Sequence, residues 1–438
     1  KTERLWKVAR SSKQPGESFR PLDGASCICY ASSKLARSMQ GGDDSKAGGS
    51  MKVLVVKIEF HTYGLPCFSG GKHAFRCLSK SLAARGIATS ILCQATRPEL
   101  MLSIIQAGGA VTMTEAVEGG TEGSPDLLCT QESCCSVFSQ LIDDGEHTCT
   151  RPARIGEALR WLSNSKDVII IDADDCYQNP EALAEVPQAD SFLDSIAAVA
   201  RSATSVVMVV QNVHFLPFGP YGCGEPTEAT RAAWAALAGC LCVSAFVASY
   251  VEQWAGEVCP GKLSLPVHHV PLSAFGVYGE PSSVPDLGLA VADCRRAKLD
   301  EGISPPVVVQ PKLSDVKGSS IFFALAAAMP EVQFVGVSGE AVPRGFQTDN
   351  VTLRQPGTID EVLAGASVVV CPSLWQEAFG MTVVDSLLRG LPVLASDVGG
   401  HREAKLGTNH LLPVRAVTWE ECHPAGGRGG RGGRPGRG

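Results

Sequence analysis

The chain has 438 residues, a formal net charge of -7 at pH 7 and a hydrophobic content of 45%. This length and apolar content suffice for two domains of ordinary size, each with its own core. The acidic balance argues against a protein that binds nucleic acid over its whole surface.

Residues 1–50 carry nine Lys or Arg against five Asp or Glu, with many serines and no sustained hydrophobic period. This composition is typical of a disordered leader, and a transit segment is the alternative. The first convincing strand begins at Met51.

The first domain opens with a strand, a glycine-bearing loop, a helix and a second strand. The apolar run over 52–56 predicts a buried strand, and Gly70 and Gly71 lie in the loop after it. Apolar residues share one face over 72–85, which predicts a helix, and residues 88–93 predict the next strand. This βαβ order predicts a doubly wound α/β sheet.

Residues 110–150 lack a period and predict irregular structure without legible chemistry. Beyond them the alternation resumes, with a helix over 154–163, a strand over 167–171, a helix over 191–202 and a strand over 205–210.

An uncharged run of 19 residues, from Ala232 to Tyr250, has the length of a membrane span. It is rich in Ala, Gly, Cys and Ser, and it divides into a helix end over 232–238, a strand over 240–243 and a helix over 245–254. We therefore predict a buried core and no integral membrane span.

The chain has 17 cysteines, which form no pair of Cys-x-x-Cys sets. Several of them, such as Cys93, Cys240 and Cys371, lie in apolar strands. This scatter predicts buried free thiols in a reducing compartment, the cytoplasm or a plastid interior, and it favours neither a disulfide framework nor a zinc site.

A linker bearing Pro, Ser and Gly near 278–289 separates a second run of alternating elements. Strands are predicted over 306–310, 333–337 and 367–371, and a helix over 319–328. The second half thus repeats the α/β pattern of the first.

The strongest motif follows the strand that ends at Cys371. A loop carries Glu377, Phe379 and Gly380 open a helix, and Asp385 follows Glu377 by eight positions. The amino end of a helix presents unpaired N–H groups and a positive dipole end, which suit a diphosphate, and a glycine lets the ligand approach closely. Carboxylates accept hydrogen bonds from sugar hydroxyls, so the two acids can hold a hexose and a ribose.

The segment from Val368 to Val414 closely resembles the donor-binding motif of the family 4 glycosyltransferases of the GT-B fold, which carry an acid, seven residues and a second acid. The run 388–400 looks like a plant and algal branch of that family. One departure is the second acid, which is usually Glu and is Asp385 here. Its shorter arm weakens or displaces the expected ribose contact.

The resemblance implies two Rossmann-like domains that face a cleft, an acceptor domain over 51–280 and a donor domain over 281–415. It also implies a retaining transfer of a hexose from a nucleotide diphosphate sugar to an acceptor that the sequence does not identify. Glu377 would orient the sugar, and Phe379, Gly380 and Met381 would meet the donor phosphates.

The same resemblance assigns the two lysines of Pro311–Gly318. Lys312 falls on an Arg and Lys317 on a Lys that neutralise the donor diphosphate in the family. Lysine retains the charge but loses the bidentate fork of arginine. Two solvated surface lysines are the alternative interpretation.

His214 ends a strand, where the family places a His against the donor sugar. The carboxyl ends of parallel strands line the cleft of an open sheet, although a lone His is as often structural. Gly70 and Gly71 match the family's glycine loop, which brings the acceptor domain close to the donor phosphates. Turns use the same pair.

The stretch Asp172-Ala173-Asp174-Asp175 offers a competing hypothesis, because Asp-x-Asp binds a divalent metal in glycosyltransferases of the GT-A fold. The GT-B pattern already supplies cations and a helix end for the diphosphate. We therefore interpret these acids as capping or cleft-rim residues, with a position facing the acceptor as the alternative, and we expect no metal and no cofactor. The fingerprints of dehydrogenases, P-loop NTPases, serine hydrolases and zinc proteases are missing from the sequence.

The sequence over 416–438 becomes a Gly- and Arg-rich tract, where the family continues with helices that pack across both domains. We expect those helices to be absent, so that the C-terminal part is truncated. Arg-Gly tracts can bind RNA, and a flexible tail is the alternative. Two further functions stay open at this point: a GT-B nucleotide-sugar epimerase, and a non-catalytic protein that binds a sugar nucleotide or RNA.

Overall fold

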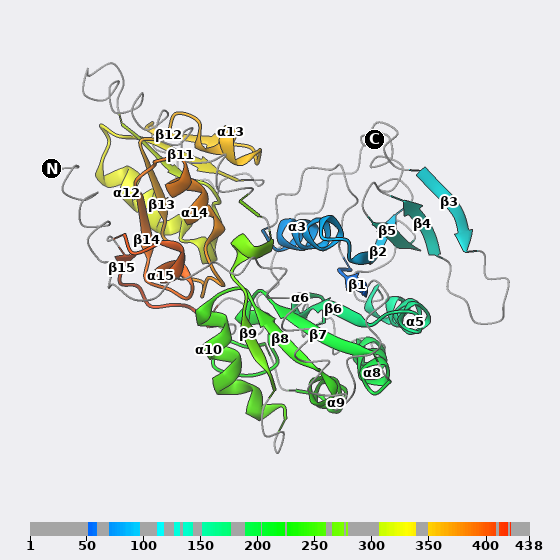
Figure 1. The fold of residues 1–438 in the computed structure, drawn as a ribbon. Coiled ribbons are helices and arrows are strands. Elements are labelled where there is room, and N and C mark those ends of the chain that lie inside the picture. The colour runs from blue at the N-terminus through cyan, green and yellow to red at the C-terminus, as the bar shows by residue number, and fades with distance from the viewer. Residues whose placement is uncertain are drawn as a thin grey trace, which may run out of the picture.

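The computed structural model describes residues 51–58, 70–96, 112–117, 127–131, 135–142, 151–176, 189–202, 204–223, 226–259, 265–275, 277–278, 306–338, 349–408, 411–418 and 421. The predicted leader over 1–50, most of the linker near 278–289 and the Arg-Gly repeats lie outside these residues. The chain forms two units, a blue-to-green one and a yellow-to-red one (Figure 1).

The first unit is built on a nine-stranded sheet in the order β3-β4-β5-β2-β1-β6-β7-β8-β9. From β5 to β9 all neighbouring strands are parallel, whereas β4 is antiparallel to both β3 and β5. The strands are β1 (Lys52–Val56), β2 (Ala88–Thr96), β3 (Thr112–Val117), β4 (Leu127–Gln131), β5 (Ser136–Ile142), β6 (Val168–Asp172), β7 (Ser205–Val210), β8 (Gly239–Cys242) and β9 (Val267–His269).

Helices connect the parallel strands of this sheet, because a parallel pair needs a crossover. Central strands such as β1 and β6 are buried almost throughout, as expected where helices cover both faces. The helices are α3 (Gly70–Ala84), α5 (Arg151–Ser163), α6 (Ala173–Cys176), α8 (Ala189–Ala200), α9 (Glu228–Ala236) and α10 (Ala245–Trp254).

The second unit has a six-stranded, wholly parallel sheet in the order β12-β11-β10-β13-β14-β15. Its strands are β10 (Val307–Gln310), β11 (Gln333–Val337), β12 (Val351–Arg354), β13 (Val368–Cys371), β14 (Val393–Ser396) and β15 (Leu411–Leu412). Its helices are α12 (Ser319–Ala328), α13 (Ile359–Leu363), α14 (Met381–Leu388) and α15 (His401–Ala404).

In both sheets the order in which the chain adds strands reverses at the first strand of the unit. In the first unit β1 lies between β2 and β6, and in the second β10 lies between β11 and β13. In open α/β sheets, ligands bind in the crevice at the carboxyl ends of the strands at such a switch point. The chain thus presents two such edges.

Residues 110–150 differ from the prediction of irregular structure, because they supply β3, β4 and β5. These strands are mixed in polarity, and β4 runs antiparallel to both of its neighbours, so neither a continuous apolar run nor a strict alternation marks them.

The uncharged run over 232–250 forms the end of α9, all of β8 and the start of α10, as predicted. No helix among the described residues is long and apolar enough to cross a bilayer. The cysteines of the described part are free thiols, most of them buried.

Candidate functional site

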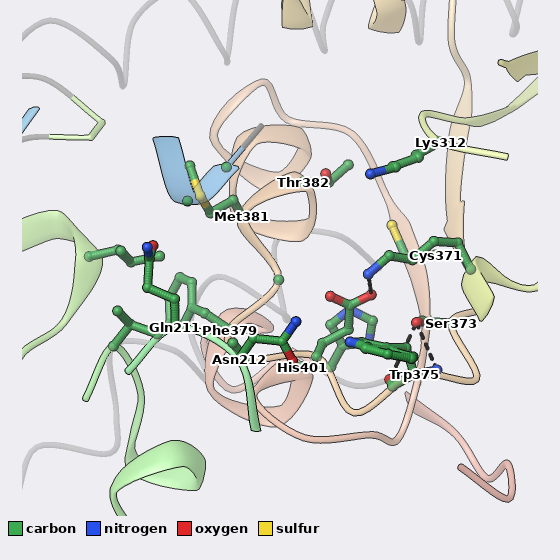
Figure 2. A pocket seen from close by; sticks show the side chains of 18 of the residues that line it. Gln211, Asn212, Lys312, Cys371, Ser373, Trp375, Phe379, Met381, Thr382 and His401 are labelled. Atoms are coloured by element: carbon green, nitrogen blue, oxygen red, sulfur yellow. Dashed lines mark hydrogen bonds and ion pairs between the residues drawn. The ribbon is translucent and has the colours of Figure 1, made fainter. Parts of the chain in front are cut away.

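A cleft of about 530 Å³ lies between the two units. Its walls include residues at the ends of both central strand pairs: Lys57 after β1, Asp172 on β6, Gln310 on β10 and Cys371 on β13. The two switch points therefore face one another across one cavity. Figure 2 shows Gln211 and Asn212 of the first unit on the left of the view, and Lys312, Cys371 and Ser373 of the second unit on the right.

The loop from β13 to α14 forms the floor of the cleft on the side of the second unit. Gly380 precedes α14 with φ of +101°, in the left-handed region that favours glycine. A Cβ at this position would come within 2.6 Å of His401 Cδ2. No side chain in the described part of the chain caps the amino end of α14, and Phe379, Gly380, Met381 and Thr382 all line the cleft. The first N–H groups of α14 are thus oriented for an anion.

Glu377 lies at the centre of this loop and pairs with Lys317. Lys317 Nζ lies 2.5 Å from Glu377 Oε1. Burial alone would raise the pKa of Glu377, but the charges and hydrogen bonds of its neighbours, the Lys317 ammonium first among them, together outweigh burial and lower the pKa to about 2. Glu377 is therefore an anion at neutral pH, able to accept hydrogen bonds but not to act as a general acid.

Lys312 and Lys317 lie on the loop after β10, which Gln310 holds in place. The Gln310 side-chain amide donates to the carbonyls of Lys312 at 3.0 Å and Lys317 at 2.8 Å. Burial lowers the pKa of Lys312, and the nearby charge of Lys317 lowers it further. Among the described residues Lys312 forms no ion pair like that of Lys317 with Glu377, so an anionic ligand would relieve the repulsion between the two lysines.

The glycines at the start of α3 lie on the opposite wall, where the helix begins two residues earlier than predicted. A Cβ at Gly70 would lie 3.0 Å from Met381 Sδ, and one at Gly71 would lie 3.2 Å from the Gln211 side chain. Small residues here let the amino end of α3 approach the amino end of α14 (Figure 2).

His214 is placed differently from the other predicted residues. It is fully buried and does not contribute to the cleft lining. Its ring stacks on Trp375 at a centroid distance of 3.4 Å, and its Nε2 accepts a hydrogen bond of 3.0 Å from the Gln376 N–H. The ring is therefore one layer behind the cavity, against the loop that carries Glu377.

Asp385 also lies outside the cleft lining. Its carboxylate is 3.5 Å from Arg389 Nη1, one turn further along the chain. Burial raises the pKa of Asp385 to about 6, because the Arg389 charge offsets only part of the desolvation. The expected ribose contact remains a prediction.

The acids of 172–175 are largely engaged inside the first unit. Lys57 Nζ lies 2.6 Å from Asp172 Oδ2 and 2.7 Å from Asp175 Oδ1. Burial by itself would lower the pKa of Lys57, but these two carboxylates more than reverse it and raise that pKa. Gln211 Nε2 also donates to Asp172 at 2.9 Å. Asp172 and Asp174 line the cleft, so this network forms its first-unit wall.

The structure brings most of the predicted site residues into one cavity: Gly70, Gly71, Lys312, Lys317, Glu377, Phe379, Gly380 and Met381. Sequence reasoning missed Lys57, Gln310 and His401. A polar residue that closes an apolar strand is the available signal for Gln310.

The loop region matches a known protein family. Residues 349–405, which contain Glu377, Gly380 and Asp385, match the family described as "Glycosyl transferases group 1". No curated protein gives a significant match.

The overall fold resembles solved glycosyltransferase structures. The catalytic domain of Starch Synthase IV from Arabidopsis thaliana, bound to ADP and acarbose, matches with a TM-score of 0.53 and 15% identity over 81% of this chain and 84% of that one. Anabaena HepE in complex with UDP-glucose matches with a TM-score of 0.50 and 16% identity, over 84% and 87%. A glycosyltransferase from Rickettsia africae matches with a TM-score of 0.50 and 11% identity, over 84% and 86%.

The chain has the GT-B fold. The predicted pair of Rossmann-like domains is confirmed by the two sheets and by these likenesses. The family match within this fold supports a glycosyltransferase. The assignment to family 4 and to a plant and algal branch remains a prediction.

Proposed function

We propose that the protein is a retaining glycosyltransferase that moves a hexose from a nucleotide diphosphate sugar to an acceptor bound by the first unit. The observation that carries this proposal is the convergence of Lys312, Lys317 and the uncapped amino end of α14 on one cavity. Two ammonium groups and a helix end are the groups that a departing diphosphate needs.

Leaving-group stabilisation is the main role of the second unit in this proposal. As the glycosidic bond to the diphosphate breaks, negative charge grows on the phosphate oxygens, where the lysines and the α14 N–H groups would stabilise it. Glu377, ionised beside them, would accept hydrogen bonds from sugar hydroxyls and orient the ring. Retention follows if the acceptor attacks from the face that the leaving group vacates.

Catalysis would be independent of a metal ion. Lys57 already lies between Asp172 and Asp175, so these acids have an internal cation at hydrogen-bonding distance. Among the described residues, no group of three or more His, Cys, Asp or Glu side chains is arranged to hold a metal. The lysines and the helix end supply the positive charge that a metal would otherwise provide.

A thermal-shift screen against UDP-, GDP- and ADP-glucose would test the proposal, since a ligand that binds only the folded protein raises its melting temperature. ADP-glucose and UDP-glucose are the first choices, because the similar structures hold ADP and UDP-glucose. We expect one donor to stabilise the wild type and to stabilise Glu377→Ala much less. No shift with any nucleotide sugar would contradict the proposal.

Transfer or donor hydrolysis would then be measured with that donor in EDTA and in manganese. We expect equal rates in both. Complete loss in EDTA that manganese restores would favour a metal-bound diphosphate at the 172–175 acids.

A further inference from the structure

We propose that the first unit positions the acid of the donor site: His214 and Ser244 hold the peptide groups on either side of Glu377, so the sugar-binding part of the site is complete only when the two units are docked. The inference rests on the proposed function only for the identity of the ligand.

Glu377 is flanked by two hydrogen bonds that cross between the units. The Gln376 N–H donates to His214 Nε2 at 3.0 Å. On the other side of Glu377, the Ala378 carbonyl accepts a hydrogen bond from the Ser244 hydroxyl. Within the second unit, the Glu377 carbonyl accepts from the Gly400 N–H at 2.7 Å. The backbone of the acid is thus fixed from both units.

His214 is itself held rigidly. It follows β7 in a short 3-10 turn, where its N–H donates to the Asn212 side chain at 3.1 Å. The ring is fully buried between Trp375 and Tyr221, with centroid distances of 3.4 and 5.7 Å. Because Nε2 accepts the Gln376 N–H, it carries no proton in this arrangement.

Ser244 performs two tasks with one hydroxyl. Its oxygen accepts a hydrogen bond of 3.1 Å from the Val247 N–H, which caps α10, while its proton goes to the Ala378 carbonyl. The neighbouring Ala245 N–H donates to Glu403 of α15 at 2.8 Å. The start of α10 is therefore a contact site for the second unit, and α10 lies below α15 in Figure 1.

The positions of Lys312 and Lys317 do not depend on the contacts made by His214 and Ser244. The loop of Lys312 and Lys317 is held by Gln310, which belongs to the second unit. Loss of the clamp formed by His214 and Ser244 should therefore weaken the grip on the sugar more than the grip on the diphosphate. This difference separates a positioning role from general support of the fold, which would affect both ligands alike.

The first experiment measures amide exchange without any ligand. Hydrogen exchange of the peptide that contains Gln376 and Ala378 would be compared in the wild type, His214→Leu and His214→Gln. Leucine removes the acceptor, whereas a glutamine amide oxygen can take the place of Nε2. We expect exchange about 10-fold faster in His214→Leu and near wild type in His214→Gln. Equal exchange in all three would overturn the clamp.

The second experiment compares binding of UDP with UDP-glucose, and of ADP with ADP-glucose, by calorimetry. We expect His214→Leu and Ser244→Ala to weaken nucleotide-sugar binding about 10-fold and nucleotide binding less than threefold. Ser244→Thr, which keeps the hydroxyl, is the matched control. Equal losses for sugar-bearing and sugar-free ligands, or no loss, would overturn the positioning role.

The two experiments separate the inference from the proposed function. If the wild type binds none of the four ligands, the proposed function fails, and the exchange measurement alone decides whether the clamp exists. If His214→Leu does not fold, the comparison of Ser244→Ala with Ser244→Thr decides whether the clamp positions Glu377. Threonine keeps the hydroxyl that alanine lacks, and it differs otherwise only by one methyl group.

Discussion

Lys317 and Glu377 both line the cleft and form a close ion pair, with their charged atoms 2.5 Å apart. The pair is largely screened from solvent, since only 24% and 18% of the two side chains are exposed. In the proposed function the donor diphosphate binds Lys317 and the sugar hydroxyls donate hydrogen bonds to the Glu377 carboxylate, so both ligand groups replace the ion pair. The pair therefore keeps Glu377 ionised until a ligand arrives.

We expect Lys317→Met to be the more damaging single change in this pair. It leaves the Glu377 carboxylate without its cation, so burial will raise the pKa of Glu377, and donor affinity should fall by about 100-fold. Lys317→Arg retains the charge and should lose about 10-fold or less. Calorimetric titration with the stabilising nucleotide sugar would measure both. If Met and Arg behaved alike, the charge of Lys317 would not matter.

Gly380→Ala should destabilise the protein and disturb the start of α14. The residue needs a positive φ, and the added Cβ would meet His401. Gly365→Ala is the matched control, because its φ is +78° but nothing lies within 4 Å of the added Cβ. We expect about 1 kcal/mol of destabilisation for the control and about 3 kcal/mol for Gly380→Ala in urea unfolding. A difference near zero would mean that His401 moves aside at no cost.

Asp385 should make stability fall as pH rises. Its folded pKa of about 6 lies above its ordinary value of 3.8, so between these pH values the native state binds more protons than the unfolded state. The native state is thus favoured below about pH 4 by this group, and the advantage is lost as pH rises through 6.

The Asp385→Asn variant removes this dependence. Relative to the wild type, it should gain about 3 kcal/mol of stability between pH 4 and pH 8. Arg389 keeps Asp360 as a partner at 2.7 Å, so the substitution does not leave it unpaired. Unfolding curves at a series of pH values would test this, and parallel pH profiles of the two proteins would refute it.

Gln310→Met should weaken binding of the nucleotide diphosphate itself. The substitution keeps the size of a side chain that is 2% exposed but removes both hydrogen bonds to the lysine loop. We expect about 10-fold lower affinity for UDP or ADP. Gln333→Met, at the start of β11, is the control and should change affinity little. An unaltered affinity in Gln310→Met would show that the loop holds its shape unaided.

The sequence predicted the elements with strong periods well, and several boundaries agree with the structure, such as 205–210, 245–254 and 319–328. Each of these segments combines an apolar pattern with a local stop signal. The three strands within 110–150 were missed because they mix polar and apolar residues, so that neither a continuous apolar run nor a strict alternation marks them.

The donor side of the site was predictable for a similar reason. Lys312, Glu377 and Gly380 follow strand ends, and a switch point brings strand ends together. The burial of His214 behind Trp375 could not be foreseen, because it depends on how the loop of the second unit docks on the first. The Lys57 network was missed because Lys57 and Asp172 are more than 100 residues apart and meet only through the pairing of β1 with β6.

The course of the Glu377 loop is set by main-chain contacts with three glycines elsewhere in the second unit. A Cβ would stand 2.1 Å from the Pro372 carbonyl oxygen at Gly318, 2.1 Å from the Glu377 carbonyl oxygen at Gly399, and 2.4 Å from the Ala378 carbonyl oxygen at Gly400. No rotamer change can relieve such overlaps, so these positions should accept no other amino acid. Engineering of sugar preference should therefore randomise the side chains that project from the loop and leave these three sites untouched.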